Sequence, residues 1–406
     1  MSTTDTPTEP LNPLDPAMAV DPYPVYERLR TTDPVHMSAL GALVLTRHAD
    51  VEKLLGDNET FQHQYVAQQQ MRVGPQVEDE PYFDYFRRMV FVLDNPDHRR
   101  IRKLLHRAFT PARVREMRDR ATSIVTGLFD QHADARRMEL VRDVAFPFPM
   151  RVIGSIMGLP DEDHDRIGGF ATALNPVLEF LPMSPEVLAK ANDAVGELAE
   201  YFTALAAKRR EDATDDLFSA MVHATEDGDV LSDEELIANA ILLYVAGHET
   251  TAGGTGLAVK TFAENRSQWE LLQQRPDLVP NAVEEVLRHD TPGQGTARVV
   301  MADTSFGDVP VAAGNFVLGY IGAANRDPEA FPDPTALDIT RDFTALPRPA
   351  TWGGGAHFCM GRNLALQEFE IVLETLLQRC PDYQVDGFEF RSNPLMRGLE
   401  RLEISW

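Results

Sequence analysis

Apolar residues recur at helical spacing along most of the chain. In residues 363–378, for example, apolar side chains follow the three- and four-residue steps of one helix face. A much longer helix is expected up to about Glu264, because Ser232 and Glu235 have the spacing of a capping box at a helix start. The same period predicts a first helix over residues 23–29 and further helices from His98 onward.

Strand-like segments are short, and we expect them at residues 35–37, 42–46, 298–301, 309–311 and 316–320, with a final group in 388–405. Residues 61–92 show no regular period and carry clustered aromatic side chains, which predicts a long functional loop. Residues 168–182, interrupted by Pro176, are expected to form a hinge between two helices. We therefore predict a mainly α fold with small antiparallel β-sheets, built as a single domain over residues 16–406 after a disordered tail, residues 1–15.

The composition restricts the class of protein. With 43% apolar residues among 406, the chain can bury a large core, and its net charge of −25 argues against binding to nucleic acid or an anionic membrane. The most apolar stretch, residues 237–259, contains His248 and Glu249 and is better explained as a buried helix than as a membrane span. Because two cysteines, Cys359 and Cys380, cannot build a disulfide framework and no signal peptide is apparent, we expect a cytoplasmic protein.

Cys359 is the most informative residue for chemistry. It follows a glycine-rich run, residues 352–358, and stands just before the helix predicted over 363–378. The positive end of that helix and its unpaired N–H groups favour a thiolate, and glycines let a backbone approach a flat, bulky group. This arrangement suggests an axial ligand to haem iron. A cysteine hydrolase that uses Cys359 with His357 is a second explanation.

Two further motifs are weak on their own. In the middle of the long helix, Thr250 can bond the carbonyl of Ala246, bend the helix and open a groove for dioxygen or water beside Glu249. A buried helix whose polar residues face a neighbouring helix explains the same segment. Glu285 and Arg288, spaced i, i+3, can form an ion pair on one helix face, as many surface residues do.

Residues 97–120 form a basic segment on this acidic chain. Nine basic side chains stand there against three acidic ones. Such a segment is either the solvated face of a helix or a surface that attracts an acidic partner. The nine are Arg99, Arg100, Arg102, Lys103, Arg107, Arg113, Arg115, Arg118 and Arg120.

Together these motifs resemble those of the cytochrome P-450 family, in its bacterial soluble type, over nearly the whole chain. The haem loop of that family has an aromatic residue, a glycine, a cysteine and a second glycine at fixed spacing, which Trp352, Gly355, Cys359 and Gly361 match. Residues 246–250 match its oxygen-activating helix motif, and residues 285–288 its Glu-x-x-Arg motif. The family usually has Phe where Trp352 stands. We hypothesise that the indole packs on the thiolate side of the haem and modestly tunes the potential of the iron.

The resemblance implies a cytochrome P-450 fold in which haem b (iron protoporphyrin IX) lies between the long central helix and the cysteine loop. Cys359 would be the axial ligand of the iron, with Thr250 and Glu249 delivering protons on the opposite side. Glu285 and Arg288 would be structural and lock the cysteine loop, with Arg341 as a third member. The side chains expected to bind the haem propionates are those of His98, Arg102, Arg298 and His357.

The family also implies an activity, the insertion of one oxygen atom of O2 into an apolar small molecule by hydroxylation or epoxidation. Terpenoids, steroids, fatty acids and polyketides all remain open as substrates. The segment 61–92, the Pro176 hinge and residues 292–297 would form the walls of the substrate pocket. A peroxide-driven haem-thiolate enzyme and a non-catalytic haem-based ligand sensor are the alternatives, and the Glu249–Thr250 pair argues against both. The side chains expected to face the substrate are those of Leu242, Val245 and Ala246, with Gln294 and Gly295 opposite.

Enzymes of this type receive electrons one at a time from a small acidic ferredoxin, [2Fe-2S] or similar, which an NAD(P)H-dependent reductase reduces. The resemblance therefore gives the basic segment, from Arg99 to Arg120, a role in docking that ferredoxin. Neither nucleic acid nor a membrane is expected as a partner, and we expect a monomer.

Overall fold

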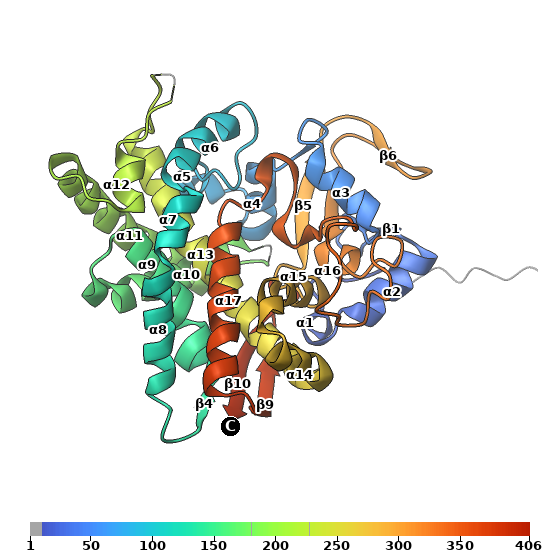
Figure 1. Ribbon diagram of the computed structural model, residues 1–406. Coiled ribbons are helices and arrows are strands. Elements are labelled where there is room, and N and C mark those ends of the chain that lie inside the picture. The colour runs from blue at the N-terminus through green and yellow to red at the C-terminus, as the bar shows by residue number, and fades with distance from the viewer. Residues whose placement is uncertain (1–9, 180, 227) are drawn as a thin grey trace, which may run out of the picture.

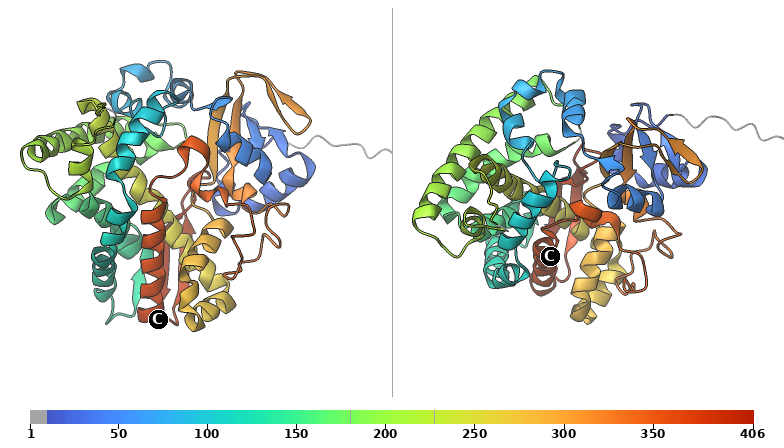
Figure 2. Two further views of the ribbon diagram at one scale, coloured as in Figure 1. Left: turned by 45° about the horizontal axis from the view of Figure 1, so that its top comes forward. Right: turned by 90° about the horizontal axis from the view of Figure 1, so that it is seen from above.

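The computed structural model describes residues 10–179, 181–226 and 228–406. Figures 1 and 2 show most of the helices gathered on one side of the molecule and a smaller, strand-containing part with β1 and β5 on the other. The helices are α1 (Ala17–Val20), α2 (Tyr23–Thr32), α3 (His48–Gly56), α4 (Tyr65–Val73), α5 (Pro81–Phe86), α6 (Asp97–Ala108), α7 (Pro111–Glu116), α8 (Arg118–Asp130), α9 (Pro147–Ile156), α10 (His164–Leu178), α11 (Pro185–Glu211), α12 (Leu217–Val222), α13 (Asp233–Glu264), α14 (Arg266–Gln274), α15 (Val279–His289), α16 (Ile321–Ala324) and α17 (Arg362–Arg379).

The strands form three small sheets. The largest has the order β1-β2-β8-β5-β3, and the others have the orders β4-β10-β9 and β6-β7. All pairs are antiparallel except β2 with β8, which the sequence did not predict. Most of the chain separates these two strands, so no tight turn forces them to run antiparallel. The strands are β1 (Val35–Met37), β2 (Leu43–Leu45), β3 (Phe61–Gln62), β4 (Arg137–Glu139), β5 (Gly295–Val300), β6 (Thr304–Phe306), β7 (Val309–Val311), β8 (Phe316–Tyr320), β9 (Gln384–Phe390) and β10 (Leu399–Ser405).

The predicted long helix is confirmed at both ends as α13. The Ser232 hydroxyl accepts the N–H of Glu235 at 3.2 Å, and the Glu235 carboxylate accepts the N–H of Ser232 at 2.9 Å. This capping box satisfies N–H groups that a helix start leaves unpaired. Most residues of α13 are buried, and α9, α10, α11, α15 and α17 pack around it. The helix therefore forms the centre of the core.

Two predicted loops are wrong in detail. Residues 61–92 contain β3, α4, a short 3₁₀ turn and α5, and several of their aromatic side chains, such as Tyr82 and Phe86, are buried core residues. These helices have nine and six residues, too few for a helical period to emerge. Pro176 does not break its helix but lies inside α10, close to the end at Leu178. The helix ends at Leu178 and the next one, α11, begins at Pro185, so the hydrogen bond that Pro176 cannot make is missing only in the last turn of α10.

Part of the predicted N-terminal tail belongs to the fold. Residues 1–9 lie outside the described residues, but Leu11 is buried beside Met18 and Tyr26, and its N–H donates to Nε2 of His36 at 3.0 Å. In the described part of the chain, no helix has the length and apolar character needed to cross a lipid bilayer.

Candidate active site

The loop that presents Cys359 is closed by its own backbone. The N–H of Cys359 donates to the carbonyl of Trp352 at 2.9 Å. Within the loop, Gly353 and Gly355 have φ angles of 68° and 56°, a region that other residues rarely adopt. Cys359 is half-buried just before α17 begins at Arg362. The loop and the helix start therefore fix the position of the thiol.

Gly354 and Gly355 allow the cysteine loop to pack closely against Leu55. A side chain at Gly354 would come within 2.9 Å of the Leu55 side chain, and one at Gly355 within 2.4 Å of the Leu55 carbonyl oxygen. These glycines let the loop pack closely against the end of α3, a contact that the sequence did not predict.

The surroundings of Cys359 raise the pKa of its thiol, whereas the helix start alone was expected to favour the thiolate. Burial raises the pKa of this thiol above its ordinary value, while the N–H groups of Gly361 and Arg362 and the charge of Arg102 act to lower it. The helix start therefore favours the thiolate but does not outweigh burial. A metal ion deprotonates a thiol that it binds, so this site suits a metal ligand better than a free nucleophile.

The predicted propionate-binding side chains gather beside this loop. The rings of His98 and His357 lie 4.1 Å apart, and Arg102 donates to the carbonyl of Phe358. His63, which the sequence analysis missed, lies 4.4 Å from His357. Burial lowers the pKa of His98 to about 4 and that of His357 to about 2, so both rings are neutral near pH 7.

These side chains form a site for an anion. The Nε2 atoms of His63 and His98 are buried and have no hydrogen-bond partner among the residues that the structure describes. Arg298 is 4% exposed and donates to Thr296 Oγ1 at 2.8 Å and to the carbonyl of Ala297 at 2.7 Å, and no described carboxylate lies within 4 Å of it. Burial lowers the pKa of Arg298 to about 10. Buried donors and an unpaired guanidinium are suited to carboxylates, and haem propionates fit this requirement.

On the other side of the site, the middle of α13 borders a cavity. Ala246 and Thr250 are exposed to it, although most residues of this helix are buried. The Thr250 hydroxyl donates to the Ala246 carbonyl at 3.3 Å, the bond that the sequence suggested. The predicted substrate-facing residues of α13 lie here as well. The cavity is lined by Phe91, Asn175, Leu178, Glu179, Leu242, Val245, Ala246, Glu249, Thr250 and Met396.

Glu249 is held through both carboxylate oxygens. Arg391, which follows β9, forms an ion pair with Oε1, and Nδ2 of Asn175 donates to Oε2 at 2.5 Å. These partners were not predictable from the sequence, because each lies far from Glu249 along the chain and outside any motif. The neighbouring His248 is fully buried and packs edge-on against the Phe146 ring, with 4.3 Å between the ring centroids.

Gln294 and Gly295 are not among the residues that line this cavity. Gln294 is fully buried, and its side chain accepts from the Tyr26 hydroxyl at 3.1 Å and donates to the Thr291 carbonyl at 2.6 Å. Gly295 begins β5, where an added side chain would come within 3.1 Å of Leu318. Both residues therefore serve packing, which corrects their predicted role in facing the substrate.

Glu285 and Arg288 form a buried ion pair that Arg341 extends. Arg288 donates to both carboxylate oxygens at 2.7 and 2.8 Å, and Nε of Arg341 donates to Oε2 at 3.0 Å. The N–H of Asp338 donates to Oε1 at 2.9 Å. Because both partners of the Glu285–Arg288 pair are fully buried, it differs from a surface ion pair. The triad ties α15 to the segment before the cysteine loop.

Trp352 has a definite partner for its indole N–H. The ring is buried, and Nε1 donates to the Glu284 carboxylate at 3.1 Å. Arg362 also forms an ion pair with Glu284, and its guanidinium lies 5.6 Å from the centre of the indole ring. Glu284 thus connects the beginning of the cysteine loop to the first residue of α17.

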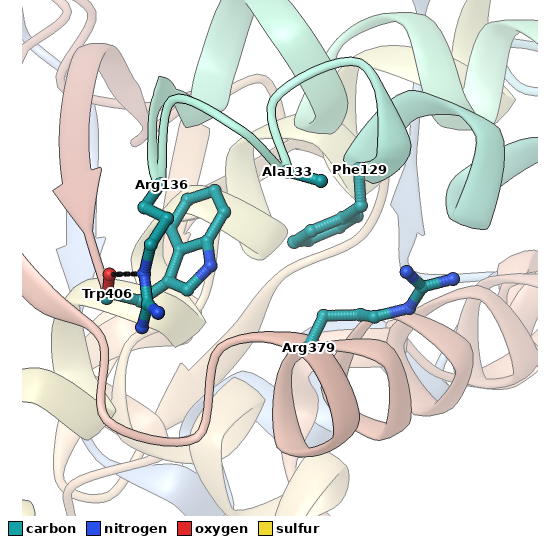
Figure 3. A pocket seen from close by; sticks show the side chains of 5 residues that line it. All are labelled: Phe129, Ala133, Arg136, Arg379 and Trp406. Carbon is teal, nitrogen blue, oxygen red and sulfur yellow. Dashed lines mark hydrogen bonds between the residues drawn. The ribbon is translucent and has the colours of Figure 1, made fainter.

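A separate hollow lies at the far end of α17. It is lined by Phe129, Ala133, Arg136, Arg379 and Trp406, and Nε of Arg136 donates to the carbonyl of Trp406 at 2.6 Å (Figure 3). The 18 residues of α17 rise about 27 Å, so this hollow is remote from Cys359. Arg379 forms an ion pair with Asp130 at 2.7 Å, and we assign the hollow no part in the chemistry.

Known proteins resemble this chain over most of its length. The family model described as Cytochrome P450 matches residues 54–381. Cytochrome P450 107B1 of Saccharopolyspora erythraea is 37% identical, with 96% of each chain covered. Nocardicin C N-oxygenase of Nocardia uniformis subsp. tsuyamanensis is 36% identical, with 100% of each chain covered. The crystal structure of CalO2 superposes with a TM-score of 0.90 at 29% identity, covering 98% of this chain and 99% of that one.

These matches agree with the mainly α fold. They confirm the predicted fold class and the predicted cofactor. The chain therefore belongs to the cytochrome P450 family, and it is a monooxygenase whose cofactor is haem b.

Proposed function

We propose that this enzyme inserts one oxygen atom of O2 into an apolar small molecule, by hydroxylation or epoxidation, in the cavity between α13 and the end of α10. The observation that carries the proposal is the exposed Thr250 hydroxyl in a cavity whose other walls include Leu178, Leu242 and Val245. Apolar walls favour an apolar ligand, and a single positioned hydroxyl group suits proton delivery. The haem, when bound, supplies the reductive activation of dioxygen.

In this proposal the haem is held from two directions. The Cys359 sulfur would bind the iron, and its position depends on the backbone bond to Trp352. A ligand on a short, closed loop has little freedom to move away from the metal. The propionates would be bound by His63, His98, Arg102, Arg298 and His357, and the buried Nε2 atoms of His63 and His98 need such a partner.

Thr250 and Glu249 deliver protons to the cavity. The bond from Thr250 to the Ala246 carbonyl is long at 3.3 Å, so the hydroxyl can turn toward the cavity at little cost. The ion pair with Arg391 keeps Glu249 at the cavity wall. The Arg391 side chain is 20% exposed and the Glu249 side chain 14%, so water can reach the ion pair.

Two experiments test these roles. The reduced protein with carbon monoxide should show the strongly red-shifted Soret band of thiolate ligation, and a band typical of histidine ligation would refute Cys359 as the ligand. Thr250→Ala should divert electrons from product to hydrogen peroxide. Thr251→Ala is the matched control, because Thr251 is buried and bonds the Gly247 carbonyl at 3.4 Å. Unchanged coupling in Thr250→Ala would count against the relay.

We also propose that an acidic ferredoxin-type protein supplies the electrons, but over a smaller surface than residues 97–120. Five of the nine basic side chains there form ion pairs within the chain, and Arg102 bonds the cysteine loop. Arg99 and Lys103 are exposed, without an ion-pair partner among the described residues, and they line a hollow with Gly355 of the cysteine loop. The five paired side chains are those of Arg100, Arg107, Arg113, Arg118 and Arg120.

The rate of haem reduction by a plant-type [2Fe-2S] ferredoxin and its NADPH-dependent reductase tests this surface. Lys103→Gln and Arg99→Gln should slow reduction, and the effect should shrink at high salt because exposed charges are screened. Arg107→Gln is the control, since the charge of Arg107 is already paired with Glu226. Equal rates in all three variants would contradict the proposed docking surface.

A further inference from the structure

One carboxylate in the cavity has no part in the proposed chemistry. Glu179 directly follows α10 and lines the cavity with apolar side chains such as Leu242 and Met396. It is half-buried, and burial raises the pKa of its carboxyl group. Glu249 is paired with Arg391, but Glu179 has no cation within 4 Å among the described residues. A carboxylate in such surroundings is costly without a partner.

The backbone around Glu179 is fixed from both sides. Arg72, on α4, donates to the carbonyl of Val177 at 2.9 Å and to that of Leu181 at 2.9 Å. In return, the Arg72 carbonyl accepts the N–H of Met183 at 3.3 Å. Arg72 is 8% exposed, so solvent competes little for these bonds. Arg72 therefore ties Val177 and Leu181 to α4, and Glu179 lies between these two residues in the chain.

Asn393 lies beside the side chain of Glu179. The Oδ1 atom of Asn393 accepts the N–H groups of Leu395 and Met396 at 3.1 and 3.0 Å. Its amide nitrogen is thereby available as a donor, and the Asn393 side chain acts to lower the pKa of the Glu179 carboxyl group. A carboxylate offers about four lone-pair sites, so one amide donor leaves acceptor capacity on the cavity side.

We propose that Glu179 is a specificity-determining residue, which accepts a hydrogen bond from a hydroxyl or amino group on an otherwise apolar substrate and so orients it. This inference rests on the proposed function of the cavity. It narrows the substrate class to apolar skeletons that carry a hydrogen-bond donor. Plain hydrocarbons and molecules whose only polar groups are acceptors would leave Glu179 unpaired and would bind less well.

Alkyl imidazoles test this proposal. The azole nitrogen binds haem iron and shifts the Soret band, so one titration measures the binding of the tail as well. The probes are imidazoles with octyl, decyl and dodecyl tails, each in plain, ω-hydroxy and ω-amino form. For at least one tail length, the preference of the wild type for a donor-bearing probe over the plain probe should fall about tenfold in Glu179→Leu. The plain probe should shift the Soret band of Glu179→Leu as well, which controls for folding, and it should bind that variant at least as tightly as the wild type because no carboxylate is left unpaired.

A second variant separates the two donors. Glu179→Gln keeps the shape and an acceptor oxygen, so it should retain most of the preference for a hydroxyl and lose that for an ammonium group, which needs the charge. Glu400→Gln is the control, because Glu400 lies 3.9 Å from Arg391 but does not line the cavity. An unchanged preference in Glu179→Leu at every tail length would overturn the proposal. Plain probes that leave the Soret band of the wild type unshifted would instead refute the haem-facing cavity itself.

Discussion

Loss of the Glu285 charge should be among the most damaging single changes outside the cavity. In Glu285→Gln, the guanidinium groups of Arg288 and Arg341 lose their shared counter-charge, at 0% and 7% side-chain exposure. Removal of one partner from a buried ion pair typically costs about 3–5 kcal/mol, because the remaining charge has no solvent around it. Glutamine keeps the size of the side chain, so the decrease in the free energy of unfolding reports the loss of the charge rather than a change in side-chain volume.

Urea unfolding of the haem-loaded protein, followed by far-ultraviolet circular dichroism, measures this cost. Glu186→Gln is the matched control, because Glu186 also pairs with a cation on its own helix, Lys190, at 2.9 Å. Both side chains of that pair are more than half exposed, so its loss should change the free energy of unfolding little.

The carbon monoxide complex provides a second measurement. Because the triad supports the segment before the cysteine loop, Glu285→Gln should also lose thiolate-type Soret absorption at lower urea concentration than the wild type. If Glu285→Gln were no less stable than Glu186→Gln, a structural role for the buried triad would be wrong.

Three further predictions concern residues around the site. Burial lowers the pKa of His248 to about 4, so unfolding takes up a proton between that pH and about 6.5, and stability should fall as the pH drops through this range. Between pH 7 and pH 5, His248→Leu should lose about 2 kcal/mol less stability than the wild type, as measured by urea unfolding at both pH values. An identical pH dependence in the two proteins would show that His248 is not the titrating group. Arg391→Gln should reduce the coupling of electron consumption to product formation severalfold, because Glu249 loses its cation, and Arg391→Lys should keep part of the coupling. Equal coupling in the wild type and both variants would exclude this role of the ion pair. Trp352→Phe removes the indole N–H that bonds Glu284 and should shift the reduction potential of the haem modestly, and an unchanged potential and Soret position would leave the indole with a packing role alone.

Local signals in the sequence predicted the central helix well, because a capping box and a long apolar period act over neighbouring residues. Ser232 and Glu235 placed the start of α13, and Glu264 is its last residue. The i, i+3 spacing of Glu285 and Arg288 likewise anticipated an ion pair that the structure contains. Its burial was not predictable from spacing, since that depends on what packs against α15.

Contacts between distant segments could not be predicted. Asn175 and Arg391 reach Glu249 from α10 and from the end of β9, and neither position belongs to a periodic pattern or a motif. His63 follows β3 in a segment without regular period, and only the fold brings it beside His357. The close contact of Gly354 was not predictable for the same reason, because its neighbour Leu55 comes from α3.

Two adjacent carboxylates on α15 support different parts of the thiolate side. Glu285 bonds Arg341 in the segment before the cysteine loop, and Glu284 bonds Trp352 within the loop and Arg362 after it. Neighbouring positions on a helix point about 100° apart, so both attachments depend on the rotational phase of α15. Insertion or deletion of a single residue earlier in this helix would turn both carboxylates away together. The length of α15 up to Glu284 is therefore constrained more strictly than the identity of most of its side chains.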